Sequence, residues 1–120
     1  QKENVMPKKV LIIEPDSIQR KGMTVALKSH AHVETIVCPK SAWPVLKERR
    51  FDVIISDLFY TGKATFHFLA KLRQMAPEAY IMVLSRDVSE KDRSAIEESG
   101  VDCYWEKPVN IQKLIELLNQ

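Results

Sequence analysis

Continuous apolar runs alternate along the chain with segments whose apolar positions are more widely spaced. Residues 9–14 (KVLIIE) form a run typical of a strand that is covered on both faces, whereas residues 16–30 shift to a helical spacing. The alternation recurs, with further strands expected at 32–38, 51–57, 79–85 and 101–106 and further helices at 41–50, 64–76, 89–100 and 110–120. The pattern predicts five strand-helix pairs.

Alternating strands and helices are typical of an α/β protein with a doubly wound parallel sheet, right-handed crossovers and helices on both faces. Local signals support the expected helix boundaries. Ser89 with Asp92 three residues later predicts a capping box, Asn110 an N-cap and Gly100 a helix stop. Pro44 fits only the first turn of the second helix.

Length and composition favour one globular domain over residues 1–120, with residues 1–8 as an N-terminal extension. The chain is 45% hydrophobic and 28% charged, and no repeat divides it. Its net charge of +2 comes from mixed acids and bases, which does not favour direct nucleic-acid binding. The absence of a spanning segment or signal peptide predicts a cytoplasmic protein without membrane contact, and Cys38 and Cys103 predict neither a metal site nor a disulfide framework.

In a doubly wound sheet, ligands gather at the carboxyl ends of the central strands. The polar residues expected there are Glu14 and Asp16 after the first strand, Asp57 after the third, Ser85 after the fourth and Lys107 after the fifth. Asp16 has Gln19 three residues later and is expected to cap the first helix rather than bind a metal.

The motifs IIEPD, VIISD, VLS and EKP, in this order, resemble the receiver domain of two-component response regulators over about residues 8–120. The resemblance implies a flavodoxin-like sheet of order 2-1-3-4-5. It also implies that Asp57 is the phosphoacceptor, that Ser85 and Lys107 bind the phosphoryl group, and that Ser85 and Tyr104 form the switch. Tyr104 also fits a half-buried strand aromatic, and Trp105, on the opposite face of the strand, is expected in the core.

The resemblance further implies a magnesium ion held by Glu14, Asp57 and the backbone carbonyl of Phe59. Magnesium would offset the charge of the phosphoryl oxygens when Asp57 attacks a phosphohistidine. The implied donor is a histidine kinase or a phosphotransfer protein. The implied output is a domain or homodimer that binds through the fourth helix, fifth strand and fifth helix, and the chain is expected to be a signalling domain in a phosphorelay rather than an enzyme.

The chain departs from the receiver pattern beside the expected site. Pro15 stands where the second carboxylate of an acidic pair is usual, so magnesium binding is expected to be weak. Thr61 stands where receiver domains frequently have a proline, and Arg86 stands where they usually have a small residue. Arg86 is expected either to screen the phosphoryl group or to point to solvent. The alternative is a pseudo-receiver, an interaction module that is not phosphorylated.

Two other classes fit less well. A phosphatase of the haloacid dehalogenase type needs a second Asp two residues after the nucleophile, where this chain has Phe59. A flavodoxin-like FMN site needs a hydroxyl- and glycine-rich loop after the first strand, where this chain is acidic. No glycine-rich nucleotide fingerprint is present.

Overall fold

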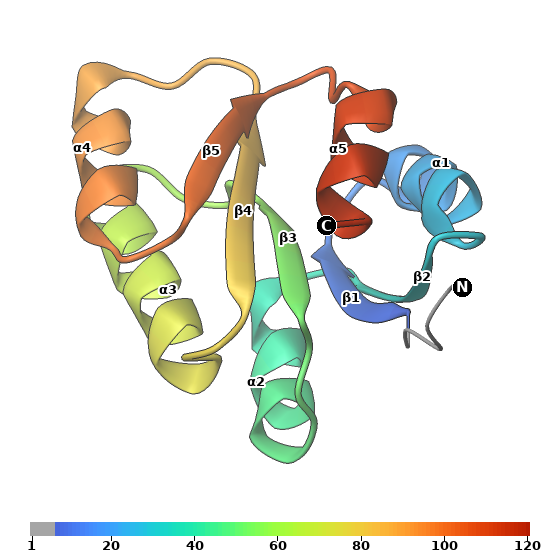
Figure 1. The fold of residues 1–120 in the computed structure, drawn as a ribbon. Coiled ribbons are helices and arrows are strands. Elements are labelled where there is room, and N and C mark those ends of the chain that lie inside the picture. The colour runs from blue at the N-terminus through green and yellow to red at the C-terminus, as the bar shows by residue number, and fades with distance from the viewer. Residues whose placement is uncertain (1–6) are drawn as a thin grey trace.

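The computed structural model describes residues 7–120 and contains the five expected strand-helix pairs (Figure 1). The strands are β1 (Lys8–Ile13), β2 (Ala31–Ile36), β3 (Val53–Asp57), β4 (Tyr80–Ser85) and β5 (Cys103–Glu106). The helices are α1 (Ser17–Leu27), α2 (Pro39–Glu48), α3 (Gly62–Met75), α4 (Glu90–Glu98) and α5 (Ile111–Leu118). Strand β1 takes in Lys8, the last residue of the expected extension, and residues 1–6 of that extension lie outside the described part.

All strands pair in parallel, in the order β2-β1-β3-β4-β5, which confirms the predicted sheet. Helices α1 and α5 cover one face, and α2, α3 and α4 cover the other (Figure 1). Side chains alternate between the two faces along each central strand because successive residues of a strand point to opposite sides. Leu11 of β1 therefore packs with α2 and α3, whereas its neighbour Ile12 packs with α1 and α5.

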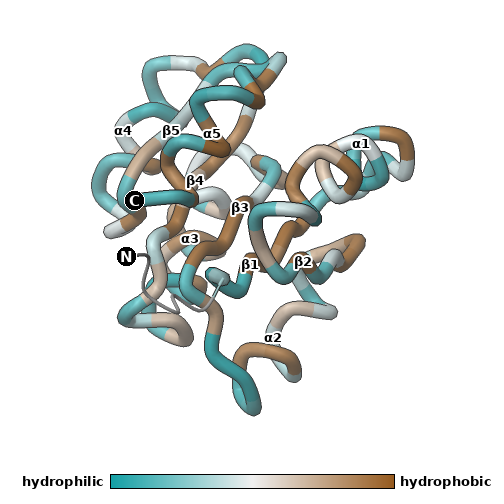
Figure 2. Tube along the Cα trace, turned by 45° about the vertical axis from the view of Figure 1, so that its right-hand side comes forward, coloured by the Kyte–Doolittle hydropathy of each residue, from teal (hydrophilic) through white to brown (hydrophobic). Residues whose placement is uncertain are grey.

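The apolar central strands lie between helices of mixed hydropathy (Figure 2), and helix α1 exposes Ile18 and Val25 to solvent. Burial of both faces explains why the central strands read as continuous apolar runs. Trp105 packs on the α5 side of the sheet and is partly exposed at the edge strand β5. Within residues 7–120, none of the helices combines the length and apolar character needed to cross a membrane.

The expected helix ends are largely present. Asp16, Ser89 and Asn110 each accept a first-turn backbone N–H at the N-terminus of α1, α4 and α5. Gly100, with φ of +94°, follows α4 in the left-handed conformation that glycine favours. The capping box is only half formed, because Asp92 donates its N–H to Ser89 but directs its carboxylate elsewhere.

The prediction for Pro44 was wrong. Helix α2 begins at Pro39, so Pro44 is the sixth helical residue rather than a first-turn residue. A proline there cannot donate to the carbonyl of Lys40. Both Lys40 and Pro44 are exposed to solvent, so water can reach the carbonyl that lacks its helical partner.

The two cysteines lie at opposite edges of the sheet. Cys38 follows the edge strand β2, and Cys103 belongs to the edge strand β5. Both are free thiols, in agreement with the sequence. Burial raises the pKa of Cys103, while its hydrogen bond with Tyr80 acts in the opposite direction.

Arg73 holds together the end of the molecule opposite the carboxyl ends of the strands. Its guanidinium donates to the carboxylate of Asp102 and to the carbonyl oxygen of Gly100. It also donates to the carbonyls of Ala76, Pro77 and Ala79 between α3 and β4. One side chain thus satisfies carbonyls from two different connections.

We expect Arg73→Ala to lower the free energy of unfolding by about 2 to 3 kcal/mol, because hydrogen bonds from a charged donor are lost together. Urea unfolding monitored by circular dichroism measures the change. The control is Arg50→Ala, since Arg50 is exposed and its nearest carboxylate oxygen, on Glu78, is 3.8 Å away. That change should stay within about 0.5 kcal/mol. Equal effects of the two substitutions would contradict the role of Arg73.

Candidate functional site

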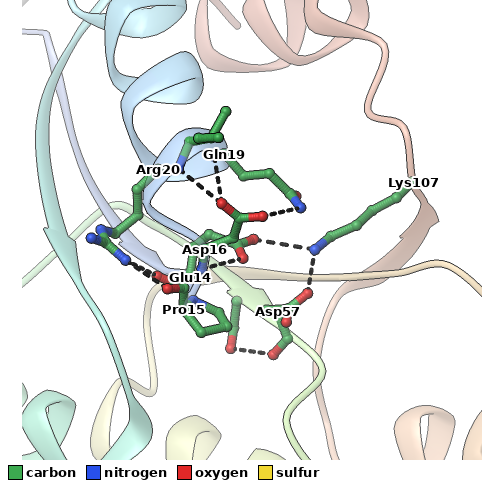
Figure 3. Close-up of polar contacts among 9 residues, drawn as sticks. Glu14, Pro15, Asp16, Gln19, Arg20, Asp57 and Lys107 are labelled. Atoms are coloured by element: carbon green, nitrogen blue, oxygen red, sulfur yellow. Dashed lines mark hydrogen bonds and ion pairs between the residues drawn. The ribbon is translucent and has the colours of Figure 1, made fainter.

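The strand ends bring together three of the residues expected at the site. Glu14 follows β1, Asp57 ends β3 and Lys107 follows β5. Parallel strands place these ends at the same edge of the sheet, and the close-up shows the side chains converging (Figure 3). The Lys107 Nζ lies 2.5 Å from Asp57 Oδ1 and 3.2 Å from Glu14 Oε1. One ammonium therefore joins two carboxylates from different strands.

The cluster is shielded from water. The exposed fractions of the side chains are 3% for Glu14, 9% for Lys107 and 18% for Asp57. Asp57 is thus the most accessible of the three charged groups. A carboxylate that is held by an ammonium and remains open on one side is suited to reaction with an incoming group.

Burial and ion pairing act in opposite directions on Lys107. Burial lowers its pKa, but the hydrogen bond and charge of Asp57, followed by those of Glu14, outweigh burial and raise the pKa above the ordinary value. Lys107 is therefore positively charged throughout the physiological range. The peptide bond between Lys107 and Pro108 is cis.

The loop after β1 directs Glu14 inward and Asp16 outward. The Glu14 backbone N–H donates to Ile36 on β2, and Glu14 Oε2 accepts the Asp16 N–H at 3.1 Å. Asp16 in turn accepts from Ile18 and Gln19, and these backbone hydrogen bonds lower its pKa. The expectation that Asp16 caps the helix is confirmed.

Arg20 also holds this loop, a role that the sequence reasoning missed. Its Nη1 donates to the carbonyls of Glu14 at 2.9 Å and Pro15 at 3.0 Å (Figure 3). The available signal was the position of Arg20 in the first turn of α1, from which a long side chain can reach back over the preceding loop.

The loop after β3 carries Phe59, whose carbonyl was the third expected metal ligand. Its ring packs edge-on against Phe68 of α3, with the ring centroids 5.9 Å apart. The loop begins with Leu58, whose N–H donates to the Leu84 carbonyl on β4 at 3.1 Å. These contacts keep the loop close to the carboxyl ends of β3 and β4.

Ser85 and Tyr104 come from the adjoining strands. Ser85 ends β4 and is partly exposed, and its carbonyl accepts the Lys107 N–H at 2.8 Å. Arg86, the next residue, is exposed. Tyr104 packs on the α4 side of the sheet, and its hydroxyl is buried without a partner among the described residues. Burial is the largest of the influences that raise its pKa. The hydroxyl thus lies inside the protein.

The donor set fits a magnesium ion with few protein ligands. No group of three or more His, Cys, Asp or Glu side chains suited to a metal occurs in residues 7–120. Two carboxylates, those of Glu14 and Asp57, nevertheless lie close enough to share one cation, because both contact Lys107. Magnesium is commonly held by one or two carboxylates with water and phosphate oxygens. Pro15 supplies no side-chain ligand.

A parallel sheet of this order, with an accessible aspartate beside a buried lysine, defines a receiver-type α/β domain. The family model of the response regulator receiver domain matches residues 10–119, and the chain belongs to this family. Receiver domains are signalling domains of two-component systems.

Curated relatives are longer than this chain. The probable transcriptional regulator ycf29 of Cyanophora paradoxa is 31% identical over 113 residues, which are 91% of this chain and 53% of that protein. The transcriptional regulatory protein BasR of Escherichia coli is 24% identical, with 88% of this chain and 48% of BasR covered. The chain thus spans about half the length of these relatives.

Solved structures of the same fold cover nearly the whole chain. The chemotaxis protein CheY4 of Vibrio cholerae has a TM-score of 0.80 at 25% identity, covering 96% of this chain and 98% of that chain. A CheY-like receiver domain protein of Methanospirillum hungatei has a TM-score of 0.84 at 19% identity, with 94% and 91% covered. The second likeness concerns the fold alone.

We expect Lys107→Met to destabilise the protein by about 3 to 5 kcal/mol, because it leaves Glu14 buried without its cation. The double variant Lys107→Met with Glu14→Gln should recover most of this loss, since the glutamine amide oxygen can still accept the Asp16 N–H but the side chain carries no charge. Urea unfolding of wild type, both single variants and the double variant measures the coupling. Additive effects of the two substitutions would contradict the ion pair.

The same comparison has an expected pH dependence. Folding raises the pKa of Lys107, so its stabilising effect is fully present below pH 10.5, the ordinary lysine value, and is lost as the pH rises through the folded-state pKa. The difference between wild type and Lys107→Met should therefore stay constant through neutral pH and shrink as the pH rises through the alkaline range.

Proposed function

We propose that Asp57 accepts a phosphoryl group and that the domain thereby switches the binding of a partner. The observation that carries this proposal is the convergence of Lys107 on Asp57 and Glu14, which leaves Asp57 as the accessible carboxylate of the cluster. The proposed donor is a histidine kinase or a phosphotransfer protein, and the proposed location of the domain is the cytoplasm.

In the proposed step, an Asp57 carboxylate oxygen attacks the phosphorus of a phosphohistidine. The new O–P bond forms as the P–N bond breaks, and the leaving imidazole nitrogen takes a proton from water. Asp57 acts as the nucleophile, and the Lys107 ammonium, held beside it, attracts the phosphoryl oxygens. Ser85, at the end of the neighbouring strand, supplies a hydroxyl donor on the other side. Neither Lys107 nor Ser85 needs to transfer a proton.

Magnesium is the proposed cofactor, with Glu14, Asp57 and the Phe59 carbonyl as its ligands. Bound there, the ion would offset the negative charge of the phosphoryl oxygens. Two features of this chain weaken its binding. Pro15 provides no carboxylate, and both Glu14 oxygens already have hydrogen-bond partners in Lys107 and the Asp16 N–H.

The proposed output surface is formed by α4, β5 and α5. Tyr104 lies on this side, and the guanidinium carbon of Arg93 on α4 is 5.9 Å from the centre of its ring. Because the Tyr104 hydroxyl is already buried, we propose that phosphorylation stabilises this inward position by drawing Ser85 toward the phosphoryl group. The partner is an output domain or a second copy of the chain, and no direct contact with nucleic acid is proposed.

The test of phosphorylation uses a small donor such as phosphoramidate with magnesium. The wild type should gain the mass of one phosphoryl group, which hydroxylamine removes because acyl phosphates are labile. Asp57→Asn should gain none. The matched control is Asp87→Asn, because Asp87 is exposed and makes no hydrogen bond or ion pair within residues 7–120. An unlabelled wild type would favour the pseudo-receiver, and a labelled Asp57→Asn would mean that another residue is the acceptor.

We expect Pro15→Asp to bind magnesium about tenfold more tightly than the wild type, since it adds a carboxylate ligand. Pro15→Ala is the control, because it removes the proline without adding an oxygen ligand. Glu14→Gln should weaken binding. Magnesium titration followed by amide shifts gives the affinities. Equal gains in Pro15→Asp and Pro15→Ala would show that proline, rather than the missing ligand, limits binding.

A further inference from the structure

The N-terminus of α3 lacks a cap from its own segment. Thr61 occupies the N-cap position, but its side chain makes no capping hydrogen bond. The first N–H groups of any α-helix have no partner within the helix, and an unsatisfied donor is costly when water is excluded. Gly62, the first residue of α3, has a φ of +60° and is partly buried.

Asp92 supplies the missing acceptor from another helix. Its Oδ1 accepts the Gly62 N–H at 2.7 Å, a short bond of the kind that a charged acceptor makes. Asp92 lies in the first turn of α4 and is only 8% exposed. Its carboxylate is therefore close to the N-termini of α3 and α4, and both helix dipoles favour a negative charge there.

This bond ties α4 to the loop that carries the proposed phosphoacceptor site. Asp57 ends β3, and only four residues separate it from Gly62. The loop is held at its start by the bond from Leu58 to Leu84 and at its end by the bond from Gly62 to Asp92. The Phe59 carbonyl lies between these two attachment points, so its position depends on both.

Helix α4 has few other internal attachments. Asp92 and Ile96 are its buried residues, so the carboxylate that reaches α3 is one of two side chains that the helix buries. The groove between the two helices, about 540 Å³ in volume, is lined by Gly62 and Lys63 from α3 and by Lys91 from α4, among others. A movement of Gly62 relative to α4 would alter this groove.

We propose that Asp92 is a positioning residue that couples the loop after Asp57 to α4. A phosphoryl group on Asp57 displaces the loop, and the bond from Gly62 to Asp92 transmits the displacement to the first turn of α4. The inference rests on the proposed phosphorylation of Asp57. It adds a second route to the output surface, separate from Ser85 and Tyr104.

The test compares amide NMR spectra with and without beryllofluoride and magnesium, which mimic the phosphoryl group. In the wild type, shifts should appear in residues 57–62 and in α4. In Asp92→Ala, the shifts around Asp57 should remain, whereas those in α4 should fall several-fold. Asp92→Asn keeps an uncharged acceptor for Gly62 and should give an intermediate response.

Ser89→Ala is the matched control. It removes the acceptor of the Asp92 N–H, and thus perturbs the same turn of α4, but leaves the Asp92 carboxylate free to bind Gly62. The α4 shifts should persist in this variant. Urea unfolding of each variant is measured in parallel, because general destabilisation would reduce the responses of Ser89→Ala and Asp92→Ala alike.

The outcomes separate this inference from the proposed function. Full-size α4 shifts in Asp92→Ala, or their equal loss in Ser89→Ala, would overturn the coupling while leaving Asp57 as phosphoacceptor. A wild type that responds near Asp57 but not in α4 would also overturn it. A wild type without any response would remove the phosphoacceptor itself, and with it this inference.

Discussion

The shared ion pair of Lys107 with Glu14 and Asp57 is the contact on which the site depends. Two carboxylates and one ammonium leave a net negative charge in a place that is largely shielded from water. Such clusters are rarely more stable than apolar residues of the same volume, because desolvation of the ions offsets their attraction. Stability alone therefore does not account for the cluster, whereas the proposed reaction, which needs a nucleophilic carboxylate beside a fixed positive charge, would account for it.

Much of the fold could be predicted because the central strands are buried on both faces and most helices begin or end with a recognisable residue. The positions of Glu14, Asp57, Ser85 and Lys107 followed from the strand ends, since parallel strands bring those ends to one edge of the sheet. The contacts made by the side chains did not follow. Asp92 occupies the sequence position of a capping-box residue. Its carboxylate, however, accepts the N–H of Gly62, which lies thirty residues away in the sequence but close by in space.

Pro15 and Arg20 show how a local substitution changes the chemistry that the site can support. Pro15 provides no carboxylate at the proposed metal site, and the Arg20 guanidinium donates to the carbonyls of the same loop. Arg20 therefore holds the loop in place and brings a positive charge near it, although it contacts neither Asp57 nor the Glu14 carboxylate. Its position in the first turn of α1 was the available signal, but a helical arginine is usually assigned to solvent.

Charge balance explains why the proposed magnesium ion would matter. The proposed conversion of the Asp57 carboxylate into an acyl phosphate would make the cluster more negative, so the cluster would need additional positive charge. Lys107 is already shared with Glu14 and can compensate only in part. Either magnesium binds despite the missing carboxylate ligand, or the loop after Asp57 and its neighbours move so that the added negative charge lies closer to other cations. In the second case, the added negative charge itself would displace the loop that Asp92 attaches to α4. The missing metal ligand and the link through Asp92 would then both favour a movement of α4.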